Sequence, residues 1–153
     1  MNINEFMIRD VIKVRETITI KELLKLLVTN KIGGVPVIDE QGKLQGMISD
    51  GDVIRFLQPR GRTIYDVYTL ILVSEQEDLK EKLKKSMNLP VKQMMKKQKL
   101  YTVKPNDHIE KAINILAENR FKKIPVVNDA GRLTGVISRG DLIRYISTEL
   151  IKD

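Results

Sequence analysis

The sequence predicts a mixed α/β (α+β) protein that contains two copies of one β-α-β-β-α unit and an ordered insertion between them. Residues 11–57 align without a gap with residues 100–146, 89 positions later, and 15 of the 47 aligned pairs are identical. Each copy has one stretch with the apolar spacing of an amphipathic helix, followed by two short β-branched stretches joined by a polar turn. Because the same elements occur twice in the same order, we interpret the chain as a structural duplication.

A short lead-in precedes each copy. Residues 3–7 align with residues 91–95 when the offset between the copies is shortened by one residue. We therefore expect a first repeat at residues 1–57, an insertion at residues 58–90 and a second repeat at residues 91–153.

The first helix of each copy is predicted from its start signal and its apolar face. Thr19 and Glu22 have the spacing of a capping box, in which a hydroxyl and a carboxylate each bond an otherwise unpaired backbone N–H. The apolar positions that follow have the i, i+3, i+4, i+7, i+8 spacing of one buried face. They are Ile20, Leu23, Leu24, Leu27 and Val28 in the first copy, and Ile109, Ala112, Ile113, Leu116 and Ala117 in the second.

Two strands and a closing helix follow in each copy. The first strand is predicted at residues 35–38 and 124–127, and the second at residues 44–48 and 133–137. Each pair is joined by a polar turn that ends in glycine, as in a hairpin. The closing helices are predicted from about Gly51 to Leu57 and from about Gly140 to Leu150.

The insertion is predicted to be ordered, because it is neither low in complexity nor rich in glycine and serine. Residues 68–73 are suited to an extra strand. Ser74 and Glu77 have the spacing of a helix cap, and the helix would run to about Asn88, before Pro90.

The positive charge of the chain is local. Residues 80–99 contain eight lysines and one acidic residue, Glu81, and this excess equals the net charge of +7. Two interpretations stay open, a solvated helix face or a nucleic-acid surface. The window contains no aromatic residues to stack on bases, so nucleic acid is the less favoured partner.

Composition makes an enzyme the least supported class. The chain has no cysteine and one histidine, so thiol chemistry and a histidine metal cluster are excluded within one chain, and we expect no metal site. No glycine-rich phosphate loop is followed by Lys-Ser or Lys-Thr. No stretch reaches the roughly 18 apolar residues of a membrane span, and charges interrupt the N-terminal residues, so we expect a cytoplasmic protein away from membranes.

The turn that opens each closing helix is the candidate binding feature. It reads Ser49-Asp-Gly-Asp52 in the first copy and Ser138-Arg-Gly-Asp141 in the second. A helix N-terminus favours anions such as phosphate, and a carboxylate has two acceptor oxygens that suit the vicinal diol of a ribose. The same spacing is also a helix cap that needs no ligand. The two roles are compatible.

These residues resemble the cystathionine β-synthase (CBS) domain in its tandem form, the Bateman module. The resemblance is carried by Gly-h-h-Ser-x-x-Asp at residues 46–52 and 135–141, where h is apolar, and by Pro-Val at residues 36–37 and 125–126. It spans roughly residues 3–57 and 91–150. It implies that the two repeats pack through their sheets as a pseudo-twofold pair with two clefts, and that modules associate as homodimers.

The resemblance also implies a non-catalytic regulatory module that binds AMP, ADP, ATP or S-adenosylmethionine and signals occupancy to an unknown protein partner by conformational change. No cofactor is required, and Mg²⁺ would enter only with a triphosphate. By family analogy Asp52 and Asp141 bind ribose, Ser49 and Ser138 approach phosphate, and Val35, Pro36, Ile124 and Pro125 hold the base. A structural or interaction module with vestigial clefts is the alternative.

The copies differ in charge around the turn. Lys122 and Lys123 occupy the positions of two glycines in the first copy, and Arg139 occupies that of Asp50. Because basic side chains form charge-assisted contacts with phosphate, we expect the phosphate contacts mainly in the second copy. Two alternatives stay open: the three basic side chains are simply solvated, or phosphate is reached from the opposite repeat.

Overall fold

The computed structural model describes residues 1–58, 80–95, 100–118 and 122–151. The strand expected at 68–73 and the cap expected at Ser74 lie outside these residues. The chain forms two compact units, which we describe separately. One contains the described parts of residues 1–13, 36–46 and 97–153, and the other those of residues 14–35 and 47–96.

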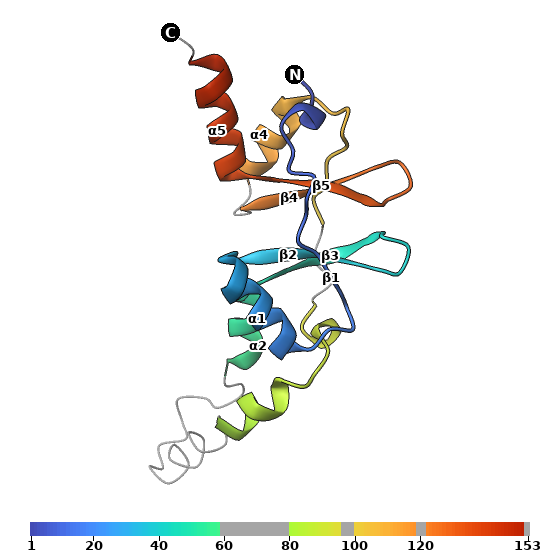
Figure 1. The fold of residues 1–153 in the computed structure, drawn as a ribbon, viewed down its shortest axis with the longest axis vertical. Helices are drawn as coiled ribbons and strands as arrows, with labels where there is room; N and C mark the ends of the chain where they lie inside the picture. Colours follow the sequence, from blue (N-terminus) through green and yellow to red (C-terminus); the bar gives the residue numbers. More distant parts are fainter. Residues whose placement is uncertain (59–79, 96–99, 119–121, 152–153) are drawn as a thin grey trace. The chain divides into compact units, whose positions relative to one another are not determined.

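The first repeat has the predicted order of elements. It runs through β1 (Val14–Arg15), α1 (Ile20–Asn30), β2 (Gly34–Ile38), β3 (Leu44–Ser49) and α2 (Asp50–Leu57). The strands form a sheet in the order β1-β2-β3, and α1 lies beside α2 (Figure 1). The β-α-β-β-α unit is therefore confirmed in this copy.

The second repeat has the same order with a reduced first strand. It contains α4 (Ile109–Glu118), β4 (Lys123–Val127), β5 (Leu133–Ser138) and α5 (Arg139–Leu150). β4 pairs antiparallel with β5, with Ile124 opposite Ile137. At the position of β1, Val103 makes an isolated parallel bridge to Val126. Helices α4 and α5 contact β4 and β5 respectively (Figure 1).

The start of α1 is the predicted capping box. Thr19 Oγ1 accepts from the backbone N–H of Glu22 at 3.1 Å, and Glu22 Oε2 accepts from the backbone N–H of Thr19 at 3.4 Å. The closing helices α2 and α5 begin one residue earlier than predicted, at Asp50 and Arg139.

The buried face of the first helix is narrower than predicted. Ile20, Leu23 and Leu27 are buried, but Leu24 is only half-buried and Val28 is 77% exposed. At 3.6 residues per turn, the i+8 position lies about 110° from the centre of the stripe formed by i, i+3 and i+7. The prediction that Val28 is buried was wrong for that reason.

The first helix of the second repeat deviates in the same way. Ile109, Ala112 and Leu116 are buried. Ile113, at the i+4 position, is 38% exposed, and Ala117, at the i+8 position, is also exposed. In both helices the apolar residues that are buried therefore form one stripe of three.

The lead-ins form matching short 3₁₀ helices, η1 (Ile3–Glu5) and η2 (Val91–Gln93), but each packs on the other repeat. The backbone N–H of Ile3 donates to the carbonyl of Asp107 at 3.0 Å, and that of Val91 donates to the carbonyl of Ile18 at 2.8 Å. Each bond lies within one compact unit. The two segments that resemble each other in sequence are thus exchanged between the repeats.

The exchange brings the N-terminal lead-in into the hydrophobic core of the second repeat. Ile3 and Met7 are buried in one cluster with residues of α4, β4, β5 and α5. The other members of this cluster are Val103, Ile109, Ala112, Leu116, Ile124, Val126, Ile137 and Leu142.

The two hairpin turns bond each other reciprocally within one compact unit. The backbone N–H of Leu44 donates to the carbonyl of Gly131, and that of Leu133 donates to the carbonyl of Gly42, both at 3.0 Å. Gly42 and Gly131 have φ values of 80° and 79°, which favour glycine. The reciprocal bonds give the turns a twofold relationship, as expected for a duplication.

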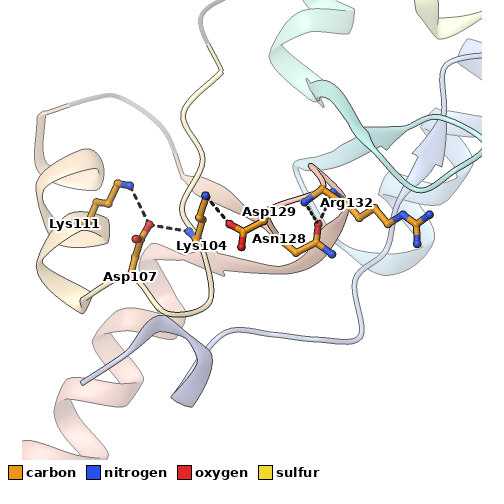
Figure 2. Close-up of polar contacts among 7 residues, drawn as sticks. Lys104, Asp107, Lys111, Asn128, Asp129 and Arg132 are labelled. Atoms are coloured by element: carbon orange, nitrogen blue, oxygen red, sulfur yellow. Dashed lines mark hydrogen bonds and ion pairs between the residues drawn. The ribbon is translucent and has the colours of Figure 1, made fainter.

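Side-chain contacts hold the second hairpin turn in place (Figure 2). Asn128 Oδ1 accepts from the backbone N–H groups of Ala130 and Arg132, at 3.0 and 2.9 Å. Lys104 Nζ lies 2.7 Å from Asp129 Oδ1, which ties the segment before α4 to this turn.

The described end of the insertion is helical from residue 80 to residue 86, close to the predicted end of its helix. Its four lysines, at positions 80, 82, 84 and 85, are exposed, whereas Ser86 is buried and donates to the carbonyl of Lys82. This arrangement agrees with a solvated lysine face. Within the described ranges, no helix is long and apolar enough to cross a membrane.

Candidate functional site

The two repeated turns have one geometry. Ser49 Oγ accepts from the backbone N–H of Asp52 at 3.3 Å, and Asp52 Oδ2 accepts from the backbone N–H of Ser49 at 2.8 Å. The corresponding distances between Ser138 and Asp141 are both 3.1 Å. Each serine and aspartate therefore form a capping box at the start of α2 or α5.

The serine hydroxyls are already engaged. Ser49 Oγ donates to Asp52 Oδ2 at 3.1 Å, and Ser138 Oγ donates to Asp141 Oδ2 at 2.6 Å. Each hydroxyl has one proton, so a hydrogen bond donated by serine to a phosphate would replace this contact. The predicted phosphate role of Ser49 and Ser138 is untested and stays a prediction.

The second oxygen of each aspartate is paired with an arginine that the sequence analysis missed. Arg55 Nη2 lies 2.8 Å from Asp52 Oδ1, and Arg144 Nη2 lies 2.5 Å from Asp141 Oδ1. Both arginines follow their aspartate by three residues, on the next turn of the helix. Their identity at equivalent positions of the two copies was the available signal.

The electrostatics of the second turn favour an ionised carboxylate. Burial of Asp141 opposes ionisation, but hydrogen bonds from Ser138 and Arg144 outweigh burial and hold its pKa below the ordinary value. Asp141 is therefore an anionic acceptor at neutral pH, the form that accepts hydrogen bonds from hydroxyl groups.

The residues that differ between the copies lie next to the turn in both repeats. In the second repeat the backbone N–H of Arg139 donates to the carbonyl of Lys122 at 3.1 Å, and Lys123 pairs with Ser138 in the sheet. In the first repeat the N–H of Asp50 donates to the carbonyl of Gly33 at 2.8 Å. The backbone arrangement is thus the same in both repeats, but its side chains are basic in the second repeat and acidic, at Asp50, in the first.

The candidate base-binding residues lie in the interior. Val35 and Ile124 are each 1% exposed, and Pro36 and Pro125 are also buried. Ile124 belongs to the core cluster of the second repeat. The predicted contact between these residues and a base is not tested by this placement and stays a prediction.

The single histidine is at a helix start, as its position in the repeat predicts. His108 Nδ1 lies 3.5 Å from the backbone N–H of Glu110, in the first turn of α4. In the part of the chain that the structure describes, no group of three or more acidic or histidine side chains is arranged to hold a metal ion.

Comparison with known proteins agrees with this repeated architecture. The sequence profile of the CBS domain matches residues 3–59 and 91–148. The uncharacterized protein MJ1426 of Methanocaldococcus jannaschii is 32% identical, and the match covers 95% of each chain. The chloroplastic CBS domain-containing protein CBSX1 of Arabidopsis thaliana is 34% identical over 93% of this chain and 62% of its own length. This chain is thus similar to less than two thirds of the plant protein.

Solved structures are similar over nearly the whole chain. The structure of CBSX2 in complex with AMP has a TM-score of 0.73 at 25% identity, and the alignment covers 99% of this chain and 98% of that one. The CBS domain pair of MJ0100, in complex with 5′-methylthioadenosine and S-adenosyl-L-methionine, has a TM-score of 0.69 at 19% identity, with 96% of each chain covered. The second likeness concerns the fold alone.

Proposed function

Because the chain belongs to the CBS-domain family and carries the domain twice, we propose that it is a non-catalytic regulatory module that binds an adenosyl ligand. The main support is that a serine-aspartate turn with the same hydrogen-bond pattern begins a helix in each repeat. The ligands in the two similar solved structures, AMP, 5′-methylthioadenosine and S-adenosyl-L-methionine, all contain adenine linked to a ribose. An adenosine group presents a ribose diol to whichever carboxylate binds it.

In this proposal Asp52 and Asp141 accept hydrogen bonds from ribose hydroxyls. An ionised carboxylate is suited to this task, because it has two acceptor oxygens and no proton to donate. The phosphate contacts come from the two turn serines, Ser49 and Ser138, and from Lys122, Lys123 and Arg139. The base lies against the strand residues Val35, Pro36, Ile124 and Pro125. AMP, ADP, ATP and S-adenosylmethionine are the candidate ligands, and Mg²⁺ would accompany only a triphosphate.

Regulation follows from differential binding. A ligand shifts a conformational equilibrium only by as much as it prefers one state over the other. We propose that occupancy changes the arrangement that a protein partner of this module recognises. No chemical step on the ligand is part of this function.

Titration calorimetry with AMP on the full chain is the direct test. We expect AMP to bind the wild type, and Asp52→Asn or Asp141→Asn to weaken binding at the corresponding turn by about tenfold or more, the effect of losing one charge-assisted contact. Asp129→Asn is the matched control, because the side chain of this aspartate is 91% exposed and belongs to neither capping box.

A thermal-shift series separates this function from its alternative. A bound ligand raises the apparent stability by RT ln(1 + [L]/Kd). If AMP, ADP, ATP and S-adenosylmethionine all left the melting temperature unchanged at concentrations far above the micromolar range, the proposed adenosyl-ligand function would be wrong.

We also propose that the chain forms a homodimer. Ile54 in α2 and Ile143 in α5 are equivalent positions of the repeat, and they are 69% and 63% exposed. Exposed isoleucine at the same site of both repeats is suited to a second copy of the chain, since the contact would bury apolar surface.

A further inference from the structure

The hydrogen-bonding capacity of each candidate ribose-binding aspartate is almost filled. Asp141 Oδ2 accepts from the backbone N–H and the hydroxyl of Ser138, and its Oδ1 accepts from Arg144. Asp52 has the same three donors from Ser49 and Arg55. An ionised carboxylate offers about four lone-pair sites, so about one is left in each copy. A ribose diol donates two hydrogen bonds, and one existing bond must therefore break.

The arginine bond is the one that is easiest to break. The capping bonds from Ser138 are partly buried and hold the start of α5. In contrast, the side chain of Arg144 is 73% exposed and that of Arg55 is 53% exposed, so water can replace the lost contact. The side chains of Asp52 and Asp141 are only 20% and 13% exposed, so the ease of separation comes from the arginine, which stays hydrated when the pair opens.

A glycine lies next to the arginine guanidinium in both copies. A Cβ on Gly51 would lie 3.2 Å from Arg55 Nη1, and a Cβ on Gly140 would lie 3.5 Å from Arg144 Nη1. Each guanidinium thus lies over the glycine, folded back toward the start of its helix. Gly51 therefore leaves room for Arg55, whereas the distance at Gly140 is that of an ordinary van der Waals contact.

We propose that Arg55 and Arg144 are gating residues. Each bonds Oδ1 of its aspartate and must release this atom when a ribose diol binds. The proposal rests on the proposed function, because it concerns the same carboxylates. The arginine acts through the aspartate and is a positioning residue that competes with the ligand. Binding exchanges an internal ion pair for a ligand contact and leaves the guanidinium free for other partners.

The test uses adenosine, which has the diol and no phosphate, so that a direct arginine–phosphate contact does not contribute. We expect Arg144→Ala and Arg55→Ala to raise the affinity of the full chain for adenosine by about two- to fivefold, the range that an exposed ion pair accounts for. The affinity for 3′-deoxyadenosine should stay unchanged, because the single hydroxyl that remains of its diol needs only the one lone-pair site that is still unfilled on each aspartate. Arg132→Ala, on an exposed hairpin residue, is the matched control.

The outcomes separate this inference from the proposed function. If wild-type protein binds adenosine and Asp141→Asn or Asp52→Asn weakens binding, but the arginine variants bind no more tightly, then the gate is wrong and the function stands. The gate is also wrong if 3′-deoxyadenosine gains as much affinity as adenosine, since a general loosening of the helix start would have that effect. If the wild type binds neither adenosine nor AMP, both proposals fail. Circular dichroism melting curves establish that each variant is folded.

Discussion

Ile3 donates its backbone N–H to the carbonyl oxygen of Asp107 at 3.0 Å, and its side chain is fully buried in the core of the second repeat. The N-terminal lead-in therefore stabilises a repeat that follows it by most of the length of the chain. We expect Ile3→Ala to lower the free energy of unfolding by about 2–5 kcal/mol, the range for truncating a buried isoleucine. Urea denaturation measures this change.

Ile8→Ala is the matched control for that variant. Ile8 directly follows the lead-in and its backbone bonds to that of Val136, but the residue is 45% exposed. We expect this variant to lose less than about 1 kcal/mol. Equal losses at positions 3 and 8 would show that the lead-in does not contribute specific core packing.

Gly135 is the second position where the lead-in constrains the sequence. A Cβ at this glycine would lie 2.9 Å from the carbonyl oxygen of Ile8 and 2.9 Å from Met7 Sδ. Gly135→Ala should therefore destabilise the protein by about 1–3 kcal/mol, as overpacking does. Gly140→Ala should instead be neutral or stabilising by up to about 1 kcal/mol, because alanine favours the helix and the nearest atom belongs to a flexible arginine. Thermal and urea denaturation measure both changes. If Gly140→Ala destabilised the protein as much as Gly135→Ala does, this account would be wrong.

Short-range patterns could be predicted from the sequence, and long-range packing could not. The serine and aspartate of each capping box are three residues apart, so their spacing indicates both the cap and the helix start. The exchange of the lead-ins has no such signal. Alignment shows that residues 3–7 resemble residues 91–95, but the bonds that place each segment on the other repeat are backbone bonds without a side-chain signature.

Only the part of the site that depends on short-range patterns could be predicted. Asp52 and Asp141 belong to a recurring motif, and their capping contacts are local. Arg55 and Arg144 are also identical in the two copies, but a basic residue one turn into a helix is ordinarily solvated. Only the three-dimensional structure shows that each guanidinium returns to its aspartate across a glycine.

The depressed pKa of Asp141 predicts how stability depends on pH. A carboxyl group with a lower pKa in the folded state contributes stability above its unfolded pKa, about 3.9, and loses it as the pH falls through the folded value. Asp141→Asn should therefore be less stable than the wild type at pH 7, and the difference should shrink below about pH 4. Ser138→Ala removes one hydrogen bond that lowers the pKa of Asp141, so the stability of this variant should also depend less on pH. Urea titrations between pH 7 and pH 2.5 would contradict this if the difference grew on acidification.

The opposite charges beside the two turns predict an asymmetric response to phosphate. Lys122→Ala and Arg139→Ala should weaken AMP binding by about tenfold, the value of one charge-assisted contact, and should change adenosine binding little. Raising the salt concentration should reduce the difference between AMP and adenosine, since the contacts are exposed and screened. Arg132→Ala is the control. Unchanged AMP affinity of both Lys122→Ala and Arg139→Ala, measured by calorimetry, would mean that neither side chain contacts the phosphate.

The exposed isoleucines of the closing helices predict where the proposed homodimer would form. Ile54→Asp and Ile143→Asp each place a charge on a surface that would be buried between two copies, and an unpaired buried charge is strongly unfavourable. We expect either variant to raise the dimer dissociation constant by at least about tenfold, measured by light scattering and sedimentation across a concentration series. Asn114→Asp, on an exposed position of α4, adds the same charge and should leave the dimer intact. A wild type that is monomeric at all concentrations, or variants that dimerise as tightly as the wild type, would exclude this surface as the interface. Because both isoleucines are already exposed in the single chain, neither substitution should reduce the stability of the monomer by more than about 0.5 kcal/mol.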